Sequence, residues 1–282
     1  MDALLPLGTA PRPDTDQDLA ARLRAALVAL AGDRVQGLDA AKIMPVLDGS
    51  DLTSLEVDLT GVVVGMPTDE SAEPVHWTPE VTERQPATLR TLRLEAHPMA
   101  AVDLPVDLTA EVADVRFAWV TAQDGMVGVE LVEPTDDAPV SGHARVAVSR
   151  EGLAGTVQGL LAVALHGNGL QLTGFDLRID QSGPRDARIE IDASIKKGMF
   201  LSATITATAS ASIDEQMVLT VGDVQLASAN PIVGALLGTV RGRVEEVAGR
   251  RIDLSEALPP GIRLDDVTLE VGEQVVLSAR LA

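Results

Sequence analysis

The chain of 282 residues contains no cysteine and no tyrosine, and it has only two tryptophans and three phenylalanines. Without cysteine it forms no disulfide and no thiolate metal site, and it has no cysteine nucleophile. The scarcity of aromatic side chains removes the platforms on which nucleic-acid bases stack. Lysine and arginine number 22 against 42 aspartates and glutamates, and the formal charge of −20 repels phosphate backbones. We therefore expect an aliphatic core and no nucleic-acid partner.

Long hydrophobic runs are also missing. No stretch reaches the roughly 18 uninterrupted apolar residues of a membrane-spanning helix. Residues 1–18 lack the basic region and apolar core of a secretory signal, so we expect a cytoplasmic protein, or one of the cell envelope if a signal was removed. The acidic charge disfavours general adsorption to anionic membranes, and any membrane contact is expected to be local and transient.

Motifs that carry catalysis or bind metals are absent as well. The chain has no G-x-S-x-G elbow, no Walker loop and no H-E-x-x-H pair. Its histidines, His76, His97, His143 and His166, are isolated, and acidic neighbours such as Asp265 and Asp266 lack the spacing of a calcium loop. We expect no catalytic residue, no cofactor and no metal site. A hydrolase whose residues converge from distant positions is the remaining enzymatic alternative.

The spacing of apolar residues predicts a helix followed by strands. Residues 1–14 contain three prolines and are expected to form an irregular lead-in. Thr15 followed by Asp18 resembles a capping box, and a helix is predicted over 16–31, ending at Gly32. From Leu55 onward the period changes to two, which indicates strands, with a loop over 66–86.

The clearest strand is predicted over 201–213, where apolar residues alternate with serine and threonine without a fault. Such a length indicates a tall or strongly curved sheet. The segment 189–195 is predicted to pair with it through a turn at 196–198. A second amphipathic helix is predicted over 231–249, and two strands are predicted to end the chain, over 264–271 and 275–281.

No repeating strand–helix–strand alternation is present in this order of elements, which argues against a parallel doubly wound sheet. The predicted class is therefore α+β, a long, curved, mainly antiparallel β-sheet wrapped around one or two amphipathic helices.

The alanines of the segment 201–213 leave space on one sheet face, and close packing requires that something fills it. One candidate is the second predicted helix, packed dry against the alanines. The other is acyl chains, because each buried methylene contributes about 0.8 kcal/mol. The candidate groove comprises Ile191, Ile195, Leu201, Ala203, Ile205, Ala207, Ala209, Ile232, Leu236, Leu237 and Val240.

Basic residues near this groove are candidate contacts to a phosphate headgroup. They are Lys196 and Lys197 at the predicted hairpin tip, together with Arg241 and Arg243 on the second predicted helix. A solvated turn is the alternative explanation of the two lysines.

Three segments resemble, in order, the LmeA-like phospholipid-binding family. They are residues 43–64, the strand Ser141–Val148 leading to a short helix near 152–161, and the turn Leu258-Pro-Pro-Gly-Ile-Arg-Leu264 with the strands after it. The resemblance implies a tubular lipid-binding (TULIP-like) half-barrel over one domain, residues 15–282. It also implies non-enzymatic binding, possibly transfer, of phospholipid or another acyl-chain ligand. This sequence departs from the family's envelope members by lacking their export signal.

A scaffold or interaction protein with a dry core and no small-molecule ligand is the alternative function. In that case exposed strand edges or the proline-rich N-terminal segment would bind partners. Nothing in the sequence identifies such a protein partner.

Overall fold

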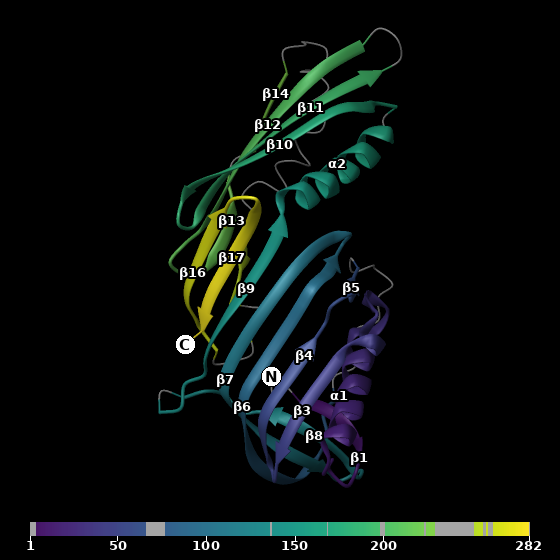
Figure 1. The fold of residues 1–282 in the computed structure, drawn as a ribbon, viewed down its shortest axis with the longest axis vertical. Helices are drawn as coiled ribbons and strands as arrows, with labels where there is room; N and C mark the ends of the chain where they lie inside the picture. Colours follow the sequence, from purple (N-terminus) through teal and green to yellow (C-terminus); the bar gives the residue numbers. More distant parts are fainter. Residues whose placement is uncertain are drawn as a thin grey trace. The chain divides into compact units, whose positions relative to one another are not determined.

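The computed structural model describes residues 4–65, 77–135, 137–167, 169–197, 201–222, 224–228, 251–255, 258 and 262–281. Residue contacts divide the chain into two compact units, whose helices and strands are labelled in Figure 1. Unit 1 comprises Met1–Ala147, Leu258–Asp265 and Ser278–Ala282, and unit 2 comprises Val148–Ala257 and Asp266–Leu277. The single TULIP-like domain predicted over 15–282 stays a prediction.

Unit 1 is built on a hairpin of two long strands, β6 (Val81–Ala101) and β7 (Leu104–Ala122). The turn between them uses two residues with positive φ, Val102 at 50° and Asp103 at 65°. The remaining strands of this sheet flank the hairpin in the order β9-β7-β6-β4-β3. Their bounds are β3 Lys42–Asp48, β4 Asp51–Asp58, β8 Met126–Leu131 and β9 Ser141–Ser149.

Most strand pairs are antiparallel, but β4 pairs with β6 in parallel. The short strands β2 (Val35–Gln36) and β5 (Val63–Val64) pair with each other, and β5 also pairs in parallel with β6. Two short 3-10 helices, η1 (Gly32–Arg34) and η2 (Leu38–Ala40), flank β2.

Strand β1 (Leu4–Thr9) corrects the expected irregular lead-in over this part of residues 1–14. It pairs antiparallel with β8, and its Leu7 is only 2% exposed. The prolines obscured it in the sequence, although proline is tolerated in strands at edges and irregular positions. The expected loop over 66–86 is likewise too long at its end, because β6 begins at Val81.

Helix α1 (Asp16–Ala31) has the bounds predicted for it. Its start is fixed by the hydroxyl of Thr15, which accepts a hydrogen bond from the Asp18 amide at 3.2 Å. Its end is Gly32, whose φ of 54° suits glycine. The helix packs beside β3 and β1 (Figure 1).

Unit 2 holds a second sheet with the strand order β10-β11-β12-β13-β15, in which β14 also pairs with β12. The strands are β10 Gln171–Gly183, β11 Asp186–Lys197, β12 Leu201–Ile213, β13 Val218–Val221, β14 Gln225–Ser228 and β15 Arg251–Asp253. The predicted pairing of β11 with β12 is confirmed, and its register runs from Lys197↔Leu201 to Asp186↔Ser212. The turn predicted at 196–198 begins too early, because Lys196 and Lys197 belong to β11 and pair with Ser202 and Leu201. Helix α2 (Arg150–His166) packs beside β10 and includes the short helix that the family resemblance implied.

Two last strands, β16 (Leu264–Val271) and β17 (Gln274–Leu281), confirm the predicted closing pair. The boundary between the units falls within β9, β16 and β17. Inside unit 2, the Arg185 guanidinium ties the turn before β11 to β16, with Nε donating to the Val267 carbonyl at 2.9 Å.

The α+β class and the mainly antiparallel pairing are therefore confirmed, but the strands form two sheets where one was expected. The finer TULIP-like arrangement stays a prediction. The second predicted helix, over 231–249, lies outside the described residues.

Candidate functional site

Unit 1 contains an apolar cavity of about 200 Å³ beside helix α1. The described residues that line it are all apolar: Leu5, Leu19, Leu23, Leu52, Leu55, Leu89, Leu92, Val115, Phe117, Trp119, Val129 and Leu131. They come from α1 and from strands β1, β4, β6, β7 and β8. Several of them, including Leu19, Leu89 and Phe117, also form the buried core of the unit. The cavity is thus a hollow at the edge of the hydrophobic core that is partly open to solvent.

Aromatic side chains from β7 build one wall of this cavity. The rings of Phe117 and Trp119 meet edge to face, with centroids 5.4 Å apart and planes inclined at 74°. The indole Nε1 of Trp119 donates a hydrogen bond of 2.8 Å to the Ser50 carbonyl oxygen. Because this bond satisfies the one polar atom of the ring, Trp119 presents an apolar surface to the cavity.

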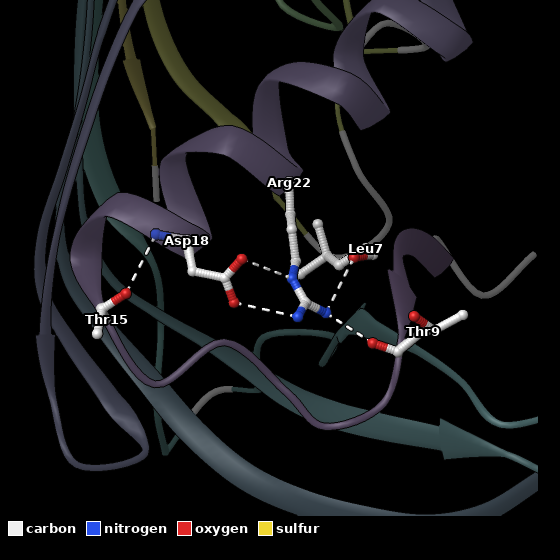
Figure 2. A network of polar contacts seen from close by, with 5 residues as sticks. All are labelled: Leu7, Thr9, Thr15, Asp18 and Arg22. Carbon is white, nitrogen blue, oxygen red and sulfur yellow. Dashed lines mark hydrogen bonds and ion pairs between the residues drawn. The ribbon is translucent and has the colours of Figure 1, made fainter.

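Helix α1 contributes Leu19 and Leu23 to the cavity lining. An arginine of this helix, Arg22, links it to strand β1 (Figure 2). Arg22 makes an ion pair with Asp18 one turn earlier, with Nη2 and Oδ2 3.1 Å apart. Its Nη1 also donates to the carbonyl oxygens of Thr9 at 2.8 Å and Leu7 at 3.4 Å. The Asp18 carboxylate therefore orients Arg22 toward β1 and does not complete the reciprocal capping box expected with Thr15.

Two further polar contacts fix the helix against unit 1. The Asp16 carboxylate accepts a hydrogen bond of 2.7 Å from the amide of Leu47 on β3. Arg24 Nη2 donates to the Ala41 carbonyl oxygen at 3.0 Å. These contacts, made at the start and middle of α1, attach the helix that carries Leu19 and Leu23 to the rest of unit 1.

The chemistry available in the cavity is apolar contact alone. No ionisable side chain occurs among the described residues that line it, so it offers no acid, base or nucleophile. An engineered apolar cavity of about 150 Å³ stays dry and binds benzene, so a cavity of this size accepts a small ring or a segment of an alkyl chain. Leu131, one of the lining residues, is 39% exposed.

A second, polar cavity of about 260 Å³ adjoins the first in unit 1. Its polar lining groups are Arg12, Glu83, Gln85 and Thr121, and it shares Trp119 with the apolar cavity. The Arg12 guanidinium carbon lies 5.6 Å from the centroid of the Trp119 ring, a cation–π arrangement. Arg12 Nη1 also donates to the Gly49 carbonyl oxygen at 3.3 Å.

The groove predicted from the sequence lies in unit 2, and strand register brings part of it together. Ile191 is paired with Ala207, and Ile195 with Ala203, so these side chains share one sheet face. Ile205 and Ala209 lie on the same face, opposite Ala193 and Ile189. Ile195 is 1% exposed, whereas the described alanines of β12 are half-buried. Use of this face as a lipid groove stays a prediction.

Other predicted site residues have less support. Leu201 begins β12, but its side chain lies outside the described part of the structure. The same holds for the predicted helix residues Ile232, Leu236, Leu237, Val240, Arg241 and Arg243. Lys196 and Lys197 are exposed at the end of β11.

The reverse face of the same sheet carries a charged cluster around Arg178 of β10. Its guanidinium lies 2.9 Å from Glu190 Oε1 and 3.2 Å from Asp176 Oδ2, and it also contacts Asp192. The hydroxyl of Thr206 donates to Asp192 Oδ1 at 2.6 Å, and this bond, with Arg178, lowers the pKa of Asp192. The nearby carboxylates, Glu190 first, raise the pKa of Arg178. One guanidinium is shared by three carboxylates here, and these contacts join β10, β11 and β12, which indicates a structural role.

Sequence reasoning missed the unit 1 cavity. Its lining residues are far apart in the chain, and each strand alone shows only a periodic pattern. One local signal was available, because Phe117 and Trp119 place two of the chain's few aromatic side chains on one face of one strand.

Among the described residues, no cluster of three or more histidine or acidic side chains is placed to hold a metal ion. Neither described helix has the length and apolarity required to cross a membrane. Comparison with known proteins gave no match to a family model, a curated protein or a solved structure.

Proposed function

We propose that the protein binds, without catalysing a reaction, a ligand that carries an acyl chain, such as a phospholipid or a fatty acid. The cavity of unit 1 then holds part of the acyl chain. The observation that carries the proposal is the apolar cavity of about 200 Å³ beside α1. Burial of each methylene there contributes about 0.8 kcal/mol and requires no directional group.

The composition of the cavity supports this ligand class over a polar metabolite. Polar ligands are recognised by a few well-placed hydrogen-bonding groups among apolar ones. The described residues that line the cavity all have apolar side chains, and the indole N–H of Trp119 already donates a hydrogen bond to the Ser50 carbonyl oxygen. A polar molecule would lose its hydrogen bonds to water without replacement there.

The first test is native mass spectrometry with lipid extraction on protein purified from its own host without detergent. Phospholipid or fatty acid bound near one to one is the expected result. Apo protein that also takes up no offered phospholipid or fatty acid would overturn the proposal and favour the scaffold function.

A cavity-filling variant then locates the ligand. Val115→Phe adds volume to the cavity wall, and we expect at least a tenfold loss of fatty-acid uptake with little change in fold. The matched control is Val46→Phe on β3, since Val46 is 44% exposed and does not line the cavity. Equal uptake by the two variants would place the ligand elsewhere.

The face of β11 and β12 is the other place for an acyl chain, as the sequence predicted. Ala207→Phe fills that face opposite Ile191. If Ala207→Phe abolishes uptake and Val115→Phe does not, the ligand binds in unit 2.

A further inference from the structure

The two cavities of unit 1 meet at Trp119, which lines both. The paired strands β7 and β8 each contribute residues to both cavities, and on each strand residues that line the polar cavity and residues that line the apolar cavity follow one another at intervals of two positions. On β7, Thr121 lines the polar cavity and Phe117 the apolar cavity, on either side of Trp119. On β8, Val127 lines the polar cavity and Val129 lines the apolar cavity. Two residues span about 7 Å of strand, so a single amphiphile can reach from one cavity into the other.

Opposite charges line the polar cavity. Arg12 supplies a guanidinium, and of its N–H groups the structure shows one engaged, in the bond to Gly49. Glu83 supplies an exposed carboxylate from β6, and it stands across the sheet from Thr121 in the strand register. No ion pair between Arg12 and Glu83 occurs among the described contacts, so each charge is available to a ligand.

We propose that the polar cavity binds the zwitterionic head of the amphiphile whose chain enters the apolar cavity. The anionic group of that head, a phosphate or a carboxylate, binds to Arg12, because guanidinium is suited to such anions. Its ammonium group binds to Glu83, with Gln85 and Thr121 as further hydrogen-bonding partners. This inference rests on the proposed function and names the class of head that accompanies the acyl chain.

The test uses probes with one dodecyl chain and different heads, titrated below their critical micelle concentrations. The heads are a phosphate, an amine and phosphoethanolamine, which carry an anion, a cation and a zwitterion. Isothermal titration is expected to show the zwitterion binding about tenfold more tightly than either the phosphate or the amine probe.

Charge-removing variants assign each contact. In Glu83→Gln, the affinity for the zwitterion is expected to fall to that for dodecyl phosphate. In Arg12→Gln, it is expected to fall to that for dodecylamine. Glu111→Gln is the matched control, since it removes one exposed carboxylate from β7 and is expected to keep the preference for the zwitterion. Glu83 is exposed, so its variant tests the inference even if Arg12→Gln does not fold.

The outcomes separate this inference from the proposed function. Equal affinity for the three probes, or an unchanged preference in Glu83→Gln, would overturn the zwitterion site and leave acyl-chain binding standing. Binding of none of the probes would remove both.

Discussion

Arg22 Nη1 donates a hydrogen bond of 2.8 Å to the carbonyl oxygen of Thr9 and thereby joins helix α1 to the end of strand β1 (Figure 2). Both elements line the apolar cavity, α1 through Leu19 and Leu23 and β1 through Leu5. A charged side chain outside the cavity, oriented by Asp18, thus links two of its walls.

Replacement of Arg22 by methionine is expected to lower the free energy of unfolding by about 1–2 kcal/mol. The variant keeps much of the aliphatic stem but leaves the Thr9 and Leu7 carbonyls without this donor. The Arg22 side chain is 22% exposed, so water replaces part of its interactions in the variant and the loss of stability is moderate. Urea unfolding followed by circular dichroism measures the change.

Arg93→Met is the control for that measurement. Arg93 pairs with Glu95 on the surface, and its side chain is 55% exposed, so we expect a change within about 0.5 kcal/mol. Similar losses of stability in the two variants would show that the link between α1 and β1 contributes no more to stability than a surface ion pair does.

Local signals made part of the fold predictable from the sequence. Helix α1 was placed at its observed bounds because its cap at Thr15 and its stop at Gly32 act within one turn of the chain. The β11–β12 hairpin was equally accessible, since uninterrupted alternation and a short connection determine which residues pair.

The pairing of strands that lie far apart in the chain could not be predicted from such local signals. Strand β1 pairs with β8, and Leu5 lies opposite Val129, far along the chain. The parallel pairing of β4 with β6 also leaves no local signal, because no tight turn joins the two strands. The cavity depends on both of these pairings, so its residues were missed although the alternation of several lining strands was recognised.

Gly128→Ala is expected to destabilise unit 1 by about 1–3 kcal/mol through overpacking. A Cβ at this position of β8 would collide with the ring of Trp77 and lie 2.5 Å from the Leu5 carbonyl oxygen. A backbone oxygen in a paired strand cannot move away easily, and β1 would be displaced from β8. Thermal unfolding and the tryptophan emission maximum report the effect.

The same substitution at another glycine, Gly155→Ala, is expected to have the opposite effect on stability. Gly155 lies inside α2, and an added Cβ would meet nothing within 4 Å. Alanine is the better helix former by about 0.5–1 kcal/mol, so this variant should be more stable than the parent. Destabilisation by Gly155→Ala as large as that by Gly128→Ala would contradict the collision argument.

Thr206→Val is expected to raise the pKa of Asp192 toward its usual range. The hydrogen bond from the Thr206 hydroxyl is the largest cause of the lowered pKa, ahead of the attraction of Arg178. A carboxyl with a lowered folded-state pKa stabilises the fold above its unfolded value of about 3.9, and that contribution is lost as the pH falls through the folded value. The variant should therefore lose this contribution at higher pH than the parent does.

Carbon-13 NMR titration of the aspartate carboxyls tests this shift directly. Asp58 is an internal control, since the Thr60 side chain and amide, with Lys42, lower its pKa independently of Thr206. Asp58 is expected to titrate identically in the variant and the parent. An unchanged titration of Asp192 would show that Arg178 alone sets its pKa.

Benzene provides a last test of the apolar cavity that needs no lipid. Leu89→Ala removes a lining side chain that is 8% exposed, and we expect a loss of about 2–5 kcal/mol and a larger cavity. Benzene that binds only the folded state should recover part of this loss in proportion to the logarithm of its concentration. Leu30→Ala is the control, because Leu30 on α1 is 41% exposed and does not line the cavity. Leu30→Ala keeps the parent cavity, so benzene should raise its melting temperature less than that of Leu89→Ala. If benzene raises the melting temperature of neither variant, the apolar cavity does not persist in solution.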